Sequence, residues 1–148
     1  MAGYKQQEWI NGGGSIGGKR AYVRKNLSLR ETATEQFPHV VIVNLAYEDL
    51  SPEGLPASGV ELSNMDETEE SIADRMSDVF GALFGLIVTS DGTRDLFFFL
   101  PMPPGDDAIQ DAIDDATPSV DYDFSVHDDP LWRPYFRFLP ENGSSPEI

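Results

Sequence analysis

A pair of apolar segments joined by Asp91-Gly92 restricts the fold of this chain more than any other feature of its sequence. Residues 86–90 and 93–100 have the apolar character of strands, and Asp-Gly between strands is among the strongest short hairpin signals. The reason is that a type I′ turn needs a positive φ at both central residues, which these two residue types tolerate. The sequence therefore predicts an antiparallel hairpin that ends at Pro101.

Three further segments have the patterns of β-strands. In residues 19–27, apolar side chains alternate with polar ones, so a half-buried strand with a basic outer face is expected. Residues 40–47 are mostly apolar and β-branched, which favours a central strand. Residues 120–126 alternate strictly between apolar and polar side chains and give the clearest strand pattern in the chain.

Apolar residues at helical spacing predict two helices. The first is expected over residues 65–84, with Asn64 as its N-cap and Glu67 in the capping-box position. Gly85 is expected to end this helix, because glycine is favoured just after the last helical turn. The second helix is shorter and is expected over residues 106–116.

After one leading strand, the predicted elements follow the order β-α-β-β-α-β. This order is typical of an α+β, ferredoxin-like fold, in which an antiparallel sheet carries both helices on one face. An aromatic C-terminal segment, residues 131–139, is expected to pack back onto this body. The predicted organisation is a flexible N-terminal segment with a glycine-rich loop at 1–18, a single domain at 19–140 and a frayed tail at 141–148.

Composition limits the function of the chain. The 148 residues include 26 acidic and 10 basic ones, for a formal net charge of −16, which argues against non-specific binding of phosphate backbones. The absence of cysteine excludes disulfides, thiolate catalysis and cysteine-ligated metals. The longest apolar stretch, residues 79–88, is too short to span a bilayer. The residues after Met1 lead into no apolar segment, so we expect no secretory signal. We therefore expect a cytoplasmic protein with no membrane partner.

The glycine-rich stretch satisfies two nucleotide-binding patterns but not their structural context. Residues 13–19 match G-x-x-x-x-G-K, and Gly12, Gly14 and Gly17 match G-x-G-x-x-G. In the first pattern Arg20 replaces the Ser or Thr that binds Mg²⁺, and in both patterns a strand follows where a helix should begin. We expect a flexible loop here, with no nucleotide or other cofactor.

Residues 19–30 hold half of the basic side chains, and this cluster has three interpretations. With Tyr22 among the cations, it is a candidate RNA-binding edge. Charges on an edge strand also discourage its pairing with another chain. In the third interpretation, the cations neutralise acidic groups of the protein itself. The charge of the whole chain repels phosphate, so nucleic acid is not the expected partner.

The strongest candidates for a metal site are Asp121, Asp123 and His127, which share one strand face. The surrounding residues lack the glycine and the glutamate of an EF-hand loop, so a solvated strand face is the favoured interpretation. His39 and His127 have no Ser or Cys nucleophile in a recognisable context. We therefore predict no metal site and no catalytic residue.

Two ordered motifs resemble those of a known family. The first is the hairpin segment 89–94 with the phenylalanines that follow at 97–99, and the second is residues 128–135. Together with Trp9, they resemble the domain of unknown function 695 family over about residues 9–140. The motif residues are Thr89, Gly92, Arg94, Asp129, Trp132 and Tyr135.

This family is distantly similar to the regulator of ribonuclease E activity B, an acidic ferredoxin-like protein. That regulator inhibits RNA decay by binding the nuclease rather than by catalysis. The resemblance therefore implies a ferredoxin-like fold and a bacterial regulator or inhibitor that acts by binding.

We expect a non-catalytic protein-interaction or regulatory module whose acidic surface binds a basic protein partner. The acids expected at this surface are Glu67, Glu70, Asp107, Asp111, Asp114 and Asp115. The alternatives are an RNA-binding module that uses residues 19–30 and a small enzyme. The aromatic residues around Trp132 form either a hot spot for the partner or a core cluster, and we predict a core cluster.

Overall fold

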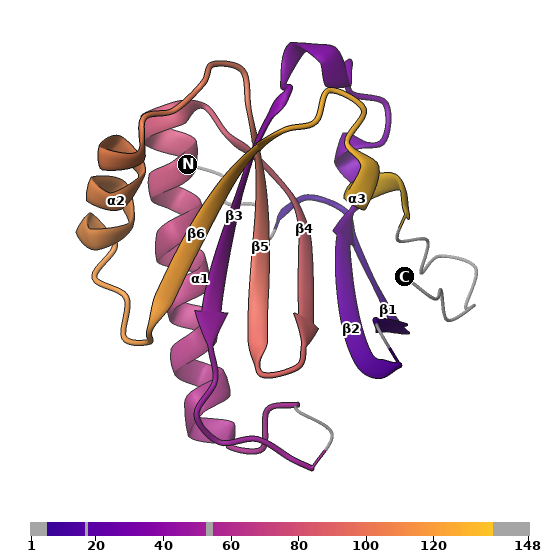
Figure 1. Cartoon of the computed structure of the whole chain (residues 1–148), viewed down its shortest axis with the longest axis vertical. Helices are drawn as coiled ribbons and strands as arrows, with labels where there is room; N and C mark the ends of the chain where they lie inside the picture. The colour runs from indigo at the N-terminus through magenta and orange to yellow at the C-terminus, as the bar shows by residue number, and fades with distance from the viewer. Residues whose placement is uncertain (1–5, 17, 53–54, 138–148) are drawn as a thin grey trace.

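The computed structural model describes residues 6–16, 18–52 and 55–137. In this part of the chain, a six-stranded antiparallel sheet carries two helices on one face and a short helix on the other (Figure 1). The strands are β1 (Trp9–Ile16), β2 (Lys19–Asn26), β3 (His39–Ala46), β4 (Leu83–Ser90), β5 (Thr93–Leu100) and β6 (Tyr122–Asp128). The helices are α1 (Gly59–Phe80), α2 (Asp106–Asp115) and α3 (Arg133–Arg137), with the 3₁₀ helices η2 (Leu27–Leu29) and η3 (Thr34–Gln36) between β2 and β3. The predicted mixture of helices with an antiparallel sheet is confirmed.

The strands follow one another in the order β1-β2-β4-β5-β3-β6, and each neighbouring pair is antiparallel. The prediction of a single leading strand is wrong, because β1 and β2 form a hairpin that pairs with β4. The loop predicted within residues 1–18 is also wrong for residues 9–16, which form β1. Glycines give no alternating side-chain pattern, and pairing with β2 decides their conformation instead. The tail predicted at 141–148 lies outside the described residues.

The predicted hairpin turn at Asp91-Gly92 is confirmed. β4 and β5 pair on either side of it, and φ is 48° at Asp91 and 86° at Gly92. Both angles are positive, as a type I′ turn requires. The turn type is therefore the one that these two residue types favour, and a hydrogen bond from Tyr47 N–H to the Gly92 carbonyl at 2.9 Å adds a contact from the end of β3.

Helix α1 begins and ends earlier than predicted. Its N-cap is Ser58, whose Oγ accepts a hydrogen bond from the backbone N–H of Glu61 at 3.2 Å. Asn64, the predicted cap, lies inside the helix. The C-cap is Gly81, whose φ of 64° is the left-handed conformation common at helix ends. The helix thus follows a capping signal that precedes the predicted one.

Gly85, the predicted end of this helix, lies in β4 at an irregularity of the β4–β5 register. A Cβ atom at this position would come within 2.7 Å of the Phe99 ring and within 3.2 Å of a Leu29 methyl group. The glycine is therefore required by close packing across the sheet rather than by the helix end.

Helices α1 and α2 lie on the same face of the sheet, as predicted (Figure 1). Helix α2 ends one residue before its predicted end. The buried residues that the two helices contribute to this first core are Met65, Ile72, Ala73, Met76, Ile109 and Ile113. Within the described part of the chain, no helix combines the length and the apolar character needed to cross a membrane.

A second core lies on the opposite face of the sheet, beneath α3. The Trp132 ring stacks on Phe99 with centroids 4.0 Å apart, and its indole N–H donates to the Phe37 carbonyl at 2.8 Å. The Tyr135 hydroxyl donates to the Asn26 carbonyl at 2.6 Å. Both rings are fully buried, and their polar groups are satisfied as burial requires. The prediction that Trp132 belongs to a core cluster is confirmed.

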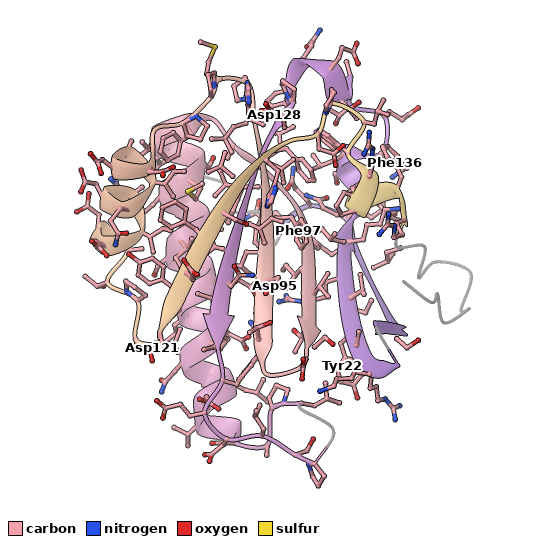
Figure 2. All side chains as sticks on the ribbon, in the orientation of Figure 1. Tyr22, Asp95, Phe97, Asp121, Asp128 and Phe136 are labelled. Carbon is pink, nitrogen blue, oxygen red and sulfur yellow. The ribbon has the colours of Figure 1, made fainter. Side chains whose placement is uncertain are left out.

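Asp95 lies on the part of this face that α3 leaves uncovered (Figure 2). Asn44 Nδ2 donates to its carboxylate at 2.8 Å. Burial raises the pKa of Asp95, and this effect outweighs the hydrogen bonds from Asn44 and Thr93, which lower it. At neutral pH the ionised side chain therefore opposes folding.

We expect Asp95→Asn to raise the free energy of unfolding at about pH 7 and to leave it nearly unchanged at about pH 3. Because the pKa of Asp95 is higher in the folded state, the stability that its carboxyl group contributes at low pH is lost as pH rises through that pKa. The amide does not ionise and so avoids this loss. Urea denaturation at both pH values measures the effect, with Asp123→Asn, an exposed acid on the same sheet face, as the control. Equal destabilisation by Asp95→Asn at both pH values contradicts this account.

Candidate functional site

Helices α1 and α2 pack side by side (Figure 1). Their outward surface is acidic. All six acids predicted to bind a partner are exposed there: Glu67, Glu70, Asp107, Asp111, Asp114 and Asp115. On α1, the exposed residues Asp74 and Asp78 extend the same ridge and were missed by the prediction. The signal that finds them is the four-residue spacing from Glu70 through Asp74 to Asp78. We call these eight residues the acidic helix layer.

Two acids of this layer are held in place by neighbouring side chains. Asp115 Oδ2 lies 3.3 Å from Nη2 of Arg75, which links α2 to α1. The Tyr122 hydroxyl donates to Asp114 Oδ1 at 2.6 Å, which links α2 to β6. Partial burial and the Asp114 carboxylate raise the pKa of Tyr122 to about 12, so the phenol keeps its proton at neutral pH. These contacts supplement the buried Ile109 and Ile113, which pack α2 onto the sheet.

The basic side chains of β2 are used within the protein. Lys19 Nζ lies 2.7 Å from Asp91 Oδ1, and Arg24 forms an ion pair with Glu69. Lys25 is only 3% exposed, and its Nζ lies 4.6 Å from the centroid of a tyrosine ring of α3. Because β2 lies between β1 and β4, its interpretation as a protected edge strand is wrong. The contacts favour the interpretation in which these cations neutralise the protein's own acids.

A buried ionic cluster joins β5 to α1. Arg94 donates from Nη1 to Glu69 and to Asp66, each at 2.8 Å, and from Nε to the Tyr47 hydroxyl at 2.9 Å. Glu69 is 1% exposed and also accepts from Arg24 of β2. Burial acts to lower the pKa of Arg94, but its interactions with Glu69, Tyr47 and Asp66 outweigh this effect and raise the pKa. Arg94 is therefore a fixed charge that ties α1 to the sheet.

The same cluster changes the acidity of Tyr47. Burial raises the pKa of Tyr47, as do the neighbouring carboxylates of Asp66 and Glu69, while the Arg94 guanidinium lowers it. The net change is a rise, so the phenol is neutral at physiological pH and retains a proton that it can donate.

Residues 7–140 match the model of a family of unknown function, DUF695. The chain belongs to this family. The resemblance to DUF695 that the sequence motifs carried is thereby confirmed. No curated protein matches the chain, and no solved structure does.

The residues on which the predicted resemblance to DUF695 rested lie at two separate places in the fold. Thr89 and Arg94 are register partners in the β4–β5 hairpin, and Gly92 forms its turn. Asp129 Oδ2 accepts a hydrogen bond from the backbone N–H of Arg133 at 2.9 Å, at the start of α3 and beside the two buried aromatics of the second core. Thr89 and Arg94 also line a cavity on the helix side of the sheet.

The candidate metal ligands of the C-terminal strand do not converge. Of the candidates Asp121, Asp123 and His127, Asp121 immediately precedes β6, whereas His127 lies at its far end beside Asp128 (Figure 2). His127 Nε2 contacts Ser125 Oγ at 2.9 Å, and His39 Nδ1 lies 3.0 Å from Asp128. Among the residues that the structure describes, no group of three or more Asp, Glu or His side chains is arranged to hold a metal ion.

Proposed function

We propose that this protein is a non-catalytic interaction module that binds a basic protein through its acidic helix layer. The observation that carries the proposal is the charge of the exposed helix surface: the layer consists of eight exposed acids, and the two helices contain only one base. The one base, Arg75, is already paired with Asp115. Such a surface attracts and orients a basic partner over about 10 Å at about 0.1 M salt.

We further propose that β3, β4, β5 and β6, with α1 and α2, form a ferredoxin-like unit to which the β1–β2 hairpin is added. The strand order supports this assignment, because β5 lies between β3 and β4, and β3 lies between β5 and β6. Each helix then connects two parallel strands that are separated by a third, which is the split β-α-β arrangement.

The resemblance to the regulator of ribonuclease E activity B suggests a class of partner. We propose a nuclease in the bacterial cytoplasm, which this chain regulates by binding. Proteins that bind phosphate backbones do so with lysine and arginine side chains. The acidic helix layer has the charge needed to occupy such a surface in place of a nucleic acid, which supports the proposal.

Amide substitutions in the acidic helix layer test the proposal. The test variant carries Glu67→Gln, Glu70→Gln, Asp107→Asn and Asp111→Asn. The control variant loses the same charge at exposed positions outside the layer, by Glu31→Gln, Glu35→Gln, Asp49→Asn and Asp123→Asn. We expect wild type and control to capture the same basic protein from a cell lysate, and the test variant to associate with it at least about tenfold more slowly at low salt. The free energy of unfolding should change by less than about 1 kcal/mol, because the substituted groups are exposed.

Two results contradict this proposal. One is association of the test variant with the captured protein at the wild-type rate and with the wild-type dependence on salt. The other is retention of RNA by wild type at physiological salt, which supports the RNA-binding alternative instead.

A further inference from the structure

A cavity of about 370 Å³ lies on the helix side of the sheet, apart from the acidic helix layer. Its walls come from β2, β4 and β5, from the segment before α1 and from the first turn of that helix, through Tyr22, Tyr47, Leu55, Leu62, Thr89 and Arg94. Sites for small molecules have volumes of about 300–1,000 Å³ and combine apolar walls with a few polar groups. The volume and lining of this cavity agree with that description.

Arg94 supplies the cavity with hydrogen-bond donors that the fold does not use. Its side chain is 6% exposed, and Nε and Nη1 bind Tyr47, Asp66 and Glu69. Among the described residues, Nη2 of Arg94 has no hydrogen-bond partner. In the part of the chain that the structure describes, the buried side-chain nitrogen and oxygen atoms that have neither solvent access nor a hydrogen-bond partner belong to Arg75 and Asp129. Because Nη2 of Arg94 has no partner and is not one of these atoms, it must be accessible, and it reaches the cavity that Arg94 lines. A buried guanidinium with unused donors is a recognition group for an oxygen anion.

Two hydroxyl groups lie beside this guanidinium. The Tyr47 oxygen accepts from Arg94 Nε, which leaves its own proton available for donation. Thr89 is the register partner of Arg94 and also of Tyr22, so the three side chains stand in a row on one face of the sheet. In the described part of the chain, neither the Thr89 hydroxyl nor the Tyr47 proton has another partner. The cavity thus presents several donors at one end.

The remaining walls and the local charge define the ligand. Tyr22 is 49% exposed, and with Leu55 and Leu62 it offers an aromatic and aliphatic surface. Glu69 and Asp66 balance Arg94 and Arg24, so the cluster has no net formal charge. An anion with a single charge is therefore repelled less at this site than a phosphate dianion is, particularly in a chain of charge −16.

We propose that this cavity binds a small monocarboxylate. The carboxylate accepts hydrogen bonds from Nη2 of Arg94 and from the hydroxyls of Tyr47 and Thr89, and the apolar body lies against Tyr22 and Leu62. A neighbouring hollow of about 460 Å³ shares Tyr22 and Thr89 with the cavity and accommodates a longer body.

Benzoate, benzamide and inorganic phosphate serve as probes, each titrated into the ¹⁵N-labelled full chain at constant ionic strength. Benzoate should shift the amide signals of Tyr22, Thr89 and Arg94 in a saturable way. Benzamide has the same ring without the charge and should bind at least about tenfold more weakly, because charge-assisted hydrogen bonds are roughly twice as strong as neutral ones. Phosphate should also bind more weakly than benzoate. Equal affinity for benzoate and benzamide, or tighter binding of phosphate, overturns the proposal.

The second part of the test uses variants that leave the buried ion pairs intact. Substitution of Arg94 itself is avoided, because it leaves Glu69 with one fewer partner and is expected to destabilise the fold. Thr89→Val keeps the β-branched shape but removes one donor, and it should weaken benzoate binding about threefold to tenfold. Tyr22→Ala should also weaken binding, through loss of the aromatic wall. The control is Leu131→Ala, which removes an exposed apolar side chain near the second core. Wild-type affinity for benzoate in folded Thr89→Val, or benzoate-induced shifts that lie outside the cavity, overturns the proposal.

Discussion

Replacement of Glu69 by alanine is expected to lower the free energy of unfolding by about 3–5 kcal/mol. The Glu69 side chain is 2% exposed and accepts hydrogen bonds from both Arg94 and Arg24. Its removal leaves the buried Arg94 with Asp66 as its remaining carboxylate partner, and Asp66 is 60% exposed to water. Urea denaturation at neutral pH measures the loss.

The neighbouring substitution Glu70→Ala is the matched control, because Glu70 is exposed on the same helix. It should change the free energy of unfolding by no more than about 0.5 kcal/mol. A double variant, Glu69→Leu with Arg94→Met, removes both charges and should recover much of the stability lost in Glu69→Ala, because no unpaired charge stays buried. Equal stability of Glu69→Ala and wild type contradicts the importance assigned to the buried cluster.

Trp132→Ala is expected to destabilise the protein by about 3–5 kcal/mol, as large-to-small changes of a buried tryptophan do. The substitution removes the ring that stacks on Phe99 and leaves the Phe37 carbonyl without its indole donor. Phe136→Ala, in the adjacent helix α3, is the control, because Phe136 is 43% exposed and should cost much less. Thermal and urea denaturation of the two variants give the comparison.

The same variant separates the two roles considered for the aromatic C-terminal segment. A folded Trp132→Ala protein with wild-type stability but weakened binding of the captured partner is the behaviour of an interface hot spot. That result contradicts the assignment of Trp132 to the second core.

The elements that the sequence predicted well are those whose conformation depends on nearby residues. The Asp91-Gly92 turn is an example, since two adjacent residue types decide it. Strand β1 is the opposite case, because its glycines carry no pattern and only pairing with β2 makes them a strand. The start of α1 was mistaken because Ser58-x-x-Glu61 and Asn64-x-x-Glu67 are both plausible caps, and prolines before the first suggested a continuing loop.

The acidic helix layer and the cavity beside Arg94 also differ in how far local sequence patterns predict them. The exposed acids of α1 and α2 are visible in the sequence, because they recur at helical spacing. The cavity beside Arg94 is not visible, because Arg94 and Glu69 are 25 positions apart and Arg94 and Tyr47 are 47 apart. Their meeting depends on the register of β3 and β5 and on the placement of α1 over the sheet, which no local pattern encodes.

The internal use of the β2 cations has a consequence for the motion of the molecule in solution. Hairpin β1–β2 forms one edge of the sheet, where positive and negative side chains pair with one another, and α2 lies toward the opposite edge at β6 (Figure 1). The exposed carboxylates of α2 therefore lie far from the paired cations of β2, and this separation contributes a dipole moment across the sheet. The basic partner that we propose would experience a torque from such a dipole while the two molecules are still separated by solvent. Under that proposal, the α2 edge would turn toward the partner before contact, which would reduce the rotational search that precedes docking.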